Sequence, residues 1–328
     1  MKLASFVGAD GVRLGVQTHD LKGVLDLDLA HRLVLGATLP AFSSMLALIQ
    51  DGGPALVAAR ALLDDCVTAS WAADAVVPIG QIEFAPPLAP PRMLCFSVYE
   101  THLRQSFEAA VTLRAGKVVG GAVKRLGLVR PPKGFYRKPV YYKGNNLSVS
   151  AHDSDVLWPR WTRMLDYEME LGVVIGKSGK NIRADDAMPY VFGYTCFNDF
   201  SARDVMMQEI PWGGVGPIKG KDFDTGNAIG PWLVTADEVP DPYDLDIQVR
   251  VNGEVRGKAR TSEMLHPIQR MIEVASDEEM IVPGEFFGTG AASNGCGIEQ
   301  LRFLEPNDIV EIEIERIGVL RNRVVKPS

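Results

Sequence analysis

The chain has 328 residues, of which 46% are hydrophobic and 23% are charged, and its formal net charge is −7. This composition is that of an ordinary globular protein, and the acidic balance argues against a nucleic acid or an anionic membrane as partner, since both require a basic face. No apolar run approaches the ~18 residues that span a bilayer, and the first residues lack a long apolar segment. We therefore expect a cytoplasmic protein whose partner is a small molecule.

The first 85 residues predict a small α+β domain. Residues 2–7 and 12–17 are short apolar runs around a turn that contains two glycines and an aspartate, a pattern typical of a β-hairpin. Apolar residues at helical spacing follow over 40–50 and 54–68.

A proline-rich segment at 85–91 marks a change in the character of the sequence. Its four prolines remove four amide donors and fix an extended backbone, so the segment fits neither a helix nor a central strand. We place a domain boundary there, between a small N-terminal domain over 1–85 and a larger domain over 86–328.

The larger domain begins with a predicted buried strand over 93–98 and a helix over 99–113. The stretch 115–138 has little apolar periodicity, and a structureless segment of that length is typical of a functional or mobile loop, for which a lid is one interpretation. Short β-type runs separated by turn residues then dominate, which favours a β-rich barrel or roll in an α+β fold. These runs cover residues 140–142, 171–175, 245–251, 286–287 and 309–317.

The four cysteines are far apart in the sequence and form none of the close pairs that build zinc or redox sites. We expect Cys66, Cys95, Cys196 and Cys296 to be free thiols, most of them buried.

Three acidic residues alternate before the run at 171–175. In a strand, Asp166, Glu168 and Glu170 would share one face, where their charges repel one another. Two interpretations remain open at this point: a solvated acidic face, or a site for a hard divalent cation that prefers carboxylate oxygens.

Two further segments carry residues suited to chemistry. Asp199 lies at a predicted strand end that runs into a helix, where either Asp199 or Ser201 could instead cap that helix. The loop around Lys221 combines cations with a glycine, which suits either a grip on a substrate carboxylate or a solvated turn. His102, near the start of the helix at 99–113, is the best placed of the five histidines to carry a proton, although a lone helical histidine is often structural.

Five segments, taken in order, resemble the fumarylacetoacetate hydrolase family over about residues 86 to 328. The resemblance implies a β-rich roll that forms a homodimer, with a metal centre and chemistry on keto or diketo acids. The matching segments are Asp166–Gly176, Asn198–Asp204, Gly220–Phe223, Phe287–Gly290 and Ile317–Val324.

The resemblance implies metal ligands at Glu168 and Glu170, which form the family's E-x-E motif, and at Asp199, which precedes Ser-Ala-Arg-Asp. The expected ion is Mg²⁺ or Mn²⁺, with Ca²⁺ as an alternative. Asp166 is then not a ligand of first choice.

The resemblance also assigns catalytic roles. His102 occupies the place of the catalytic histidine, Glu299 fits the place of its carboxylate partner in the long branch of the family, and Lys221 would help to hold an oxyanion. Gln105 stands where short-branch members carry a glutamate, and it cannot take up a proton. Cys95 stands where the long branch has a further aspartate ligand.

Three residues are expected to contact the substrate. Thr289 corresponds to the family's carboxylate contact in the Gly-Thr turn, and Arg203 and Gln105 complete the predicted set.

The predicted function is hydrolysis of a C–C bond in a small diketo acid with the help of a divalent metal. Dehydration, decarboxylation or isomerisation of a 2-keto or 2-keto-3-deoxy acid is the first alternative, because each passes through an enolate. A relative that binds keto acids without catalysis is the second.

Overall fold

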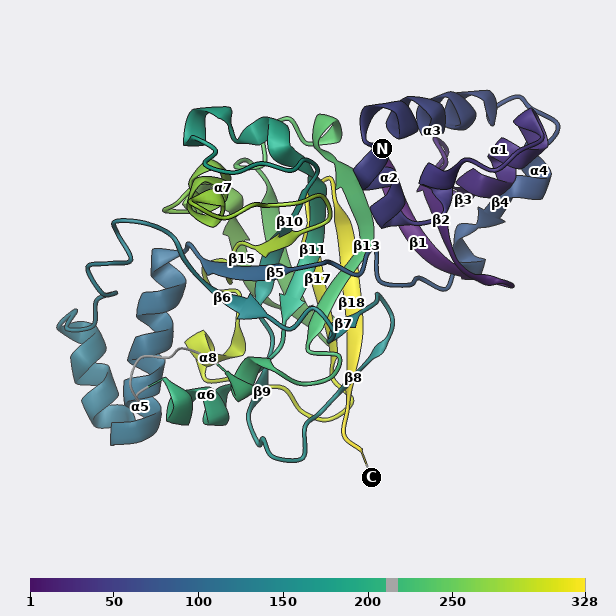
Figure 1. The fold of residues 1–328 in the computed structure, drawn as a ribbon. Coiled ribbons are helices and arrows are strands. Elements are labelled where there is room, and N and C mark those ends of the chain that lie inside the picture. Colours follow the sequence, from purple (N-terminus) through teal and green to yellow (C-terminus); the bar gives the residue numbers. More distant parts are fainter. Residues whose placement is uncertain (211–217, 328) are drawn as a thin grey trace.

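The computed structural model describes residues 1–210 and 218–327. Its architecture is mixed α+β and rich in sheet, as the sequence predicts, with an N-terminal group of helices at one end and a long helical segment at the other (Figure 1).

The chain opens with the predicted hairpin, whose strands pair in register from Leu3 with Val16 to Gly8 with Gly11. Two further strands extend it, and helices cover one side. These elements are β1 (Lys2–Gly8), β2 (Gly11–Gln17), β3 (Gly23–Asp26), β4 (Val76–Pro78), α1 (Leu27–Leu35), α2 (Met45–Asp51), α3 (Gly53–Asp65) and α4 (Ala72–Ala75).

A large sheet continues directly from this hairpin. Strand β1 pairs with β13, where Lys2 lies opposite Val234, so the sheet runs through the boundary predicted at residue 85. The order of its main path is β4-β3-β2-β1-β13-β11-β10-β16-β5-β6, and β7 pairs with β13. The strands not yet given are β5 (Met93–Ser97), β6 (Val140–Gly144), β7 (Val149–Ser150), β10 (Met169–Ile175), β11 (Val191–Asp199), β13 (Asn227–Thr235) and β16 (Phe286–Gly288).

A second sheet packs on one face of the first. Its strands bury alternate residues, as in β17, where Val310, Ile312 and Ile314 face the core. These side chains join Leu171 and Val173 of β10 in one hydrophobic cluster between the two sheets. The order is β15-β14-β17-β18-β8, formed by β8 (Asp155–Leu157), β14 (Asp246–Val251), β15 (Glu254–Arg260), β17 (Ile309–Ile314) and β18 (Gly318–Val325).

The central strands β10 and β11 are buried along their whole length. One face meets the second sheet, while Val174 and Phe197 on the other face pack with Phe286 of β16 in the cluster that includes the N-terminal helices. Polar side chains at the ends of these two strands are therefore held in a rigid, dry environment.

The remaining elements are short. Within residues 1–210 and 218–327 they comprise β9 (Leu165–Asp166), β12 (Ser201–Ala202), α6 (Arg203–Glu209), α7 (Ile268–Ser276), α8 (Gly297–Gln300) and 3₁₀ turns at Pro40–Phe42, Ile79–Gln81, Ala184–Asp186, Met188–Tyr190, Lys219–Lys221, Ala236–Glu238 and Thr261–Glu263. Strands β9 and β12 pair with each other.

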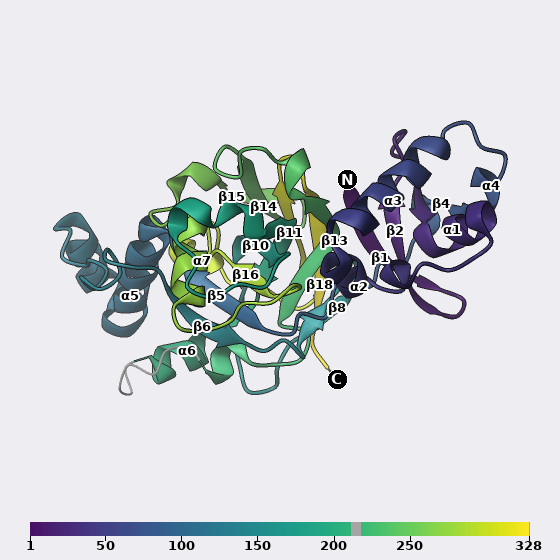
Figure 2. The same ribbon diagram turned by 45° about the horizontal axis from the view of Figure 1, so that its top comes forward.

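The long helix α5 (Glu100–Arg125) corrects one expectation. The stretch predicted to be structureless from 115 is helical again after a break at Gly116, whose φ of 84° lies in the left-handed region. The second part folds back, so that a Cβ on Gly120 would lie 2.0 Å from the Thr112 hydroxyl. Val118 on this part is 88% exposed, which explains the missing apolar periodicity. Figure 2 shows α5 at the opposite end of the molecule from α1.

The predicted free thiols are confirmed, and Cys95, Cys196 and Cys296 are buried. Among the described residues, no single helix has the length and hydropathy to cross a membrane, and only the bent pair α2 and α3 passes that test when taken together.

Candidate metal centre and histidine pair

Three carboxylates meet where β10 begins and β11 ends. The antiparallel register sets Met169 opposite Asn198, so Glu168 and Asp199 are neighbours across the strand ends and Glu170 lies on the same face as Glu168. Each of the three acidic residues offers an oxygen within 4.8 Å of the others. All three side chains are buried, so the solvated-face interpretation is wrong.

The capping interpretation of Asp199 is also wrong. Helix α6 has Ala202 at its N-cap, and no side chain of the described residues caps it. The Ser201 hydroxyl instead donates to the carbonyl of Asp199 at 2.9 Å.

Two buried cations hold the carboxylates in place. The Lys221 ammonium lies 2.8 Å from Glu168 Oε2 and 2.7 Å from Asp199 Oδ2. The Arg203 guanidinium lies 2.7 Å from Glu168 Oε1 and donates to Asp166 at 2.8 Å. Four ionised carboxylates against two cations leave two negative charges, which is the charge that one divalent ion would neutralise.

Protonation follows from burial and from this charge balance. Burial, together with the charges of Asp199 and Glu168, raises the pKa of Glu170 well above its usual range. Burial also raises the pKa of Asp199, against the opposing effect of Lys221. Burial alone would raise the pKa of Glu168 as well, but Lys221 and Arg203 bring it below its ordinary value. Without a further cation, a proton is therefore favoured most strongly at Glu170.

These residues fit a hard divalent cation. The donors are all oxygens, and Asp199 Oδ1 is buried without a hydrogen-bond partner among the described residues. Asp166 does not share this freedom, because it accepts from the amides of Gly297 and Ile298 at 2.7 and 2.9 Å as well as from Arg203. Three protein oxygens would leave further coordination positions for substrate or water.

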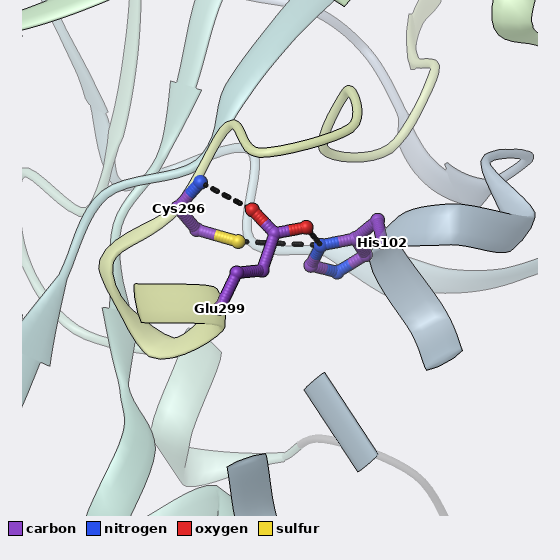
Figure 3. A group of neighbouring side chains, drawn as sticks. All are labelled: His102, Cys296 and Glu299. Atoms are coloured by element: carbon purple, nitrogen blue, oxygen red, sulfur yellow. Dashed lines mark hydrogen bonds and ion pairs between the residues drawn. The ribbon is translucent and has the colours of Figure 1, made fainter. Parts of the chain in front are cut away.

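The predicted pair of His102 and its carboxylate partner Glu299, called the histidine pair below, assembles beside the three carboxylates. His102 in the first turn of α5 places Nδ1 3.2 Å from Glu299 Oε1 in α8, and both side chains are buried (Figure 3). The other oxygen of Glu299 accepts from the Cys296 amide at 3.0 Å, which fixes the carboxylate. A proton on Nδ1 that is donated to Glu299 leaves Nε2 free to accept another. The isolated β-bridge between Glu168 and Cys296, whose sulfur lies 3.2 Å from His102 Nδ1, places the imidazole near the carboxylates.

Cys296 is a neighbour that sequence reasoning missed. Its sulfur lies 3.2 Å from His102 Nδ1, and its backbone forms an isolated β-bridge with Glu168. The sequence signal was the position of Cys296, three residues before Glu299, where it is the N-cap of the short helix α8.

The residues predicted to contact substrate are already engaged within the protein. The Thr289 hydroxyl donates to the Leu171 carbonyl at 3.0 Å, and Gln105 donates to Asn294 at 3.1 Å. Arg203 lies among the buried carboxylates and orients Asp166 and Glu168. The substrate-binding roles of these three residues stay predictions.

A cavity of about 330 Å³ opens next to Lys221. Its lining includes Tyr142, whose hydroxyl donates to Asp199 Oδ2 at 2.5 Å, and Lys143 from the same strand, β6. Larger hollows on the surface contain neither the carboxylates nor the histidine pair. Sequence reasoning missed the β6 residues because only the pairing of β6 with β5 brings them to the site.

Known proteins share this arrangement of segments. The family model described as fumarylacetoacetate (FAA) hydrolase C-terminal matches residues 110–325. Human mitochondrial oxaloacetate tautomerase FAHD2A is 32% identical over 319 residues, which cover 96% of this chain and 88% of the relative.

Two solved structures are similar over the whole chain. Maleylpyruvate hydrolase from Sphingobium sp. SYK-6, in complex with manganese(II) and pyruvate, is 25% identical with a TM-score of 0.70, and the match covers 100% of both chains. Fumarylacetoacetate hydrolase from Exiguobacterium antarcticum, 24% identical with a TM-score of 0.71 and full coverage of both chains, shows the shared fold.

Proposed function

Because the chain belongs to the fumarylacetoacetate hydrolase family, we propose that it is a divalent-metal-dependent enzyme that moves a proton on the carbon beside the ketone of a small 2-keto acid. The observation that carries this proposal is the pair formed by His102 and Glu299, 3.2 Å apart and next to three buried carboxylates.

The proposed base is His102 Nε2. Glu299 holds the ring through Nδ1 and stabilises the imidazolium that forms when Nε2 takes a proton from the substrate carbon. The Lys221 ammonium, 3.1 Å from the Asp199 carbonyl and buried, supplies positive charge near the enolate oxygen. Return of the proton to a different atom of the substrate completes a tautomerisation.

A divalent cation would be held by Glu168, Glu170 and Asp199. When bound, it supplies positive charge for the developing negative charge on the oxygens of the keto acid, worth several kcal/mol in such sites. We favour Mg²⁺ or Mn²⁺ because all three donors are carboxylate oxygens.

Keto–enol tautomerisation is the first choice of reaction. The human oxaloacetate tautomerase aligns over 96% of this chain, so the resemblance includes the N-terminal strands and helices as well as the site. A substrate with a second carboxylate also suits Lys143, a cation in the lining of the cavity beside Lys221.

Hydrolysis of a C–C bond in a diketo acid is the second candidate. The same histidine pair can activate a water molecule, and the Sphingobium structure that resembles this chain is named a maleylpyruvate hydrolase. In that reaction the C–C bond breaks after water attacks a carbonyl carbon, and a new carboxylate carries the oxygen of the water.

Isotope transfer distinguishes the two reactions. The chain, loaded with Mn²⁺, is incubated with oxaloacetate and with acylpyruvates in D₂O and, separately, in ¹⁸O-enriched water. Exchange of the carbon-bound hydrogen for deuterium above the rate with Mn²⁺ alone supports tautomerisation. Cleavage with ¹⁸O in a product carboxylate supports hydrolysis. If no substrate of the panel shows deuterium exchange or cleavage, both reactions are rejected.

A further inference from the structure

The histidine pair is part of a cluster of three different donors. His102 Nδ1, Cys296 Sγ and a Glu299 oxygen all lie within 4.8 Å of one another, and Nδ1 is 3.2 Å from each partner. The three side chains converge from α5 on one side and from α8 and the residue before it on the other (Figure 3).

The spacing matches the edges of a small coordination tetrahedron. With Zn–S near 2.3 Å and Zn–N near 2.0–2.1 Å, a tetrahedral ion separates its ligand atoms by roughly 3.5 Å. The two separations of 3.2 Å at His102 Nδ1 therefore lie within a few tenths of an ångström of two edges of such a tetrahedron, and the third edge, between Cys296 Sγ and the Glu299 oxygen, is no longer than 4.8 Å.

The donor set is unlike that of the carboxylate centre. Imidazole nitrogen, thiolate sulfur and carboxylate oxygen are each ligand types that Zn²⁺ binds, whereas the three oxygens of Glu168, Glu170 and Asp199 suit a harder ion. We propose that His102, Cys296 and Glu299 form a second site, which binds Zn²⁺ and inhibits the enzyme.

Binding at this site removes a proton from sulfur. Burial raises the pKa of the Cys296 thiol well above its usual range, with the charge of Glu299 adding to the effect, so the sulfur is protonated in the metal-free protein. Zn²⁺ replaces that proton, which is released to solvent, and the thiolate becomes a ligand.

Inhibition follows from the use of Nδ1 as a ligand. A neutral imidazole that binds an ion through Nδ1 carries its proton on Nε2, so Nε2 can no longer act as the base. Zn²⁺ would also separate Glu299 from the ring. This consequence depends on the function proposed above, whereas the binding of Zn²⁺ does not.

Cobalt provides a spectroscopic test of the thiolate ligand. The protein is first saturated with Mg²⁺, which occupies the carboxylate centre without absorbing light, and is then titrated with Co²⁺. We expect a near-ultraviolet thiolate-to-cobalt band that saturates at one Co²⁺ per chain and disappears when one equivalent of Zn²⁺ is added. Absence of this band in the wild-type protein would overturn the proposal.

Substitutions identify the sulfur. Cys296→Ser should lose the band and weaken Zn²⁺ binding by more than the 10- to 100-fold typical of losing a group outside the coordination shell. Cys66→Ser is the matched control, since Cys66 lies at the end of α3, away from the cluster. This variant should keep the cobalt band and the Zn²⁺ affinity of the wild-type protein. An unchanged band in Cys296→Ser would reject the assignment.

Two additional measurements keep the outcome clear. If circular dichroism shows that Cys296→Ser does not fold, Glu299→Gln serves instead. This variant should keep the thiolate band but require more Co²⁺ to saturate it. An unchanged Co²⁺ titration would count against the site. Inhibition of keto-acid turnover by Zn²⁺ is then measured at saturating Mn²⁺. A cobalt band without turnover in any assay rejects the proposed function alone, and turnover without a band rejects this site alone.

Discussion

Charge balance decides the chemistry of the site at the scale of single residues. Lys221 and Arg203 reach Glu168 from two sides, and Glu170 is held on its far side by the Gly290 amide at 2.8 Å. The sequence alone left these carboxylates open between surface and site. The order of the family motifs favoured the site, and the burial of all three side chains agrees with it.

His102→Ala should lower turnover by about 10²- to 10⁴-fold, the usual contribution of a general base. Mn²⁺ affinity should change little, because His102 is not one of the carboxylate ligands. His19→Asn is the matched control: His19 also pairs with a carboxylate, Asp64 at 3.0 Å, but both side chains are more than half exposed. Steady-state assays with calorimetric Mn²⁺ titrations would measure both effects, and full turnover in His102→Ala would reject the assignment.

Arg203→Met should destabilise the protein by about 3 to 5 kcal/mol, because it leaves Asp166 and Glu168 buried beside one less cation. Arg203→Lys should restore only part of this loss, since one ammonium cannot reproduce the planar fork that reaches both carboxylates. Urea unfolding monitored by circular dichroism measures the difference. A loss of unfolding free energy below about 1 kcal/mol for Arg203→Met would show that the ion pairs of Arg203 with Asp166 and Glu168 are not a structural support.

Secondary-structure elements place these residues, and here the sequence was informative for strands and less so for helices. The opening hairpin and the strand at 93–98 followed from apolar patterning and turn residues. Helix α1 was missed, although Asp26 caps it by accepting from the Leu29 amide and Gly36 ends it at φ 72°. The Asp and Gly signals were both present in the sequence. However, β3 runs directly into α1, and its apolar residues hide the point where the apolar pattern changes from that of a strand to that of a helix.

Residues from separate elements meet through pairings that local patterns do not encode. Tyr142 reaches Asp199 only because β6 lies at the edge of the sheet beside β5, and Cys296 reaches His102 only because α8 packs near the first turn of α5. The family motifs were enough to propose catalytic and metal-binding residues, whereas these two neighbours depend on the tertiary fold.

The turn after β16 offers a test at the scale of an element. Gly290 has φ 90°, and a Cβ there would lie 2.7 Å from the Phe96 carbonyl, so Gly290→Ala should displace the amide that binds Glu170. We expect weaker Mn²⁺ binding together with lower stability.

Gly253→Ala is the matched control for this turn. Its φ of 80° brings the same backbone strain, but a Cβ there would meet no atom within 4 Å. It should cost about 1 to 2 kcal/mol in unfolding free energy and leave Mn²⁺ affinity unchanged. Equal Mn²⁺ affinities in the two variants would show that the Gly290 amide does not position Glu170.

The whole molecule is a sheet that runs from the N-terminal hairpin through the site, with a second sheet on one face. The division at residue 85, the homodimer and the role of 115–138 as a lid stay predictions. From the charges at the ends of β10 and β11, however, we expect the stability of the whole fold to depend on pH and on a divalent metal.

Metal stabilisation should increase with pH. The pKa of Glu170 is raised in the folded protein, so the folded state holds an extra proton; the resulting contribution to stability is complete below the ordinary carboxyl pKa and is lost as pH rises toward the raised pKa. Mn²⁺ replaces that proton and offsets the loss. The shift in melting temperature caused by Mn²⁺ should therefore grow between about pH 5 and pH 8, and Glu170→Gln should flatten it. A shift that decreases over this range would contradict the charge balance described for the site.

Metal-dependent hydrogen exchange in D₂O tests the central claim most directly. The chelator-treated protein, supplied with one equivalent of Mn²⁺, should exchange the carbon-bound hydrogens next to the ketone of a 2-keto acid faster than Mn²⁺ alone. Both Glu170→Gln and His102→Ala should abolish that excess. Undiminished exchange without any divalent ion, or in both variants, would contradict the account.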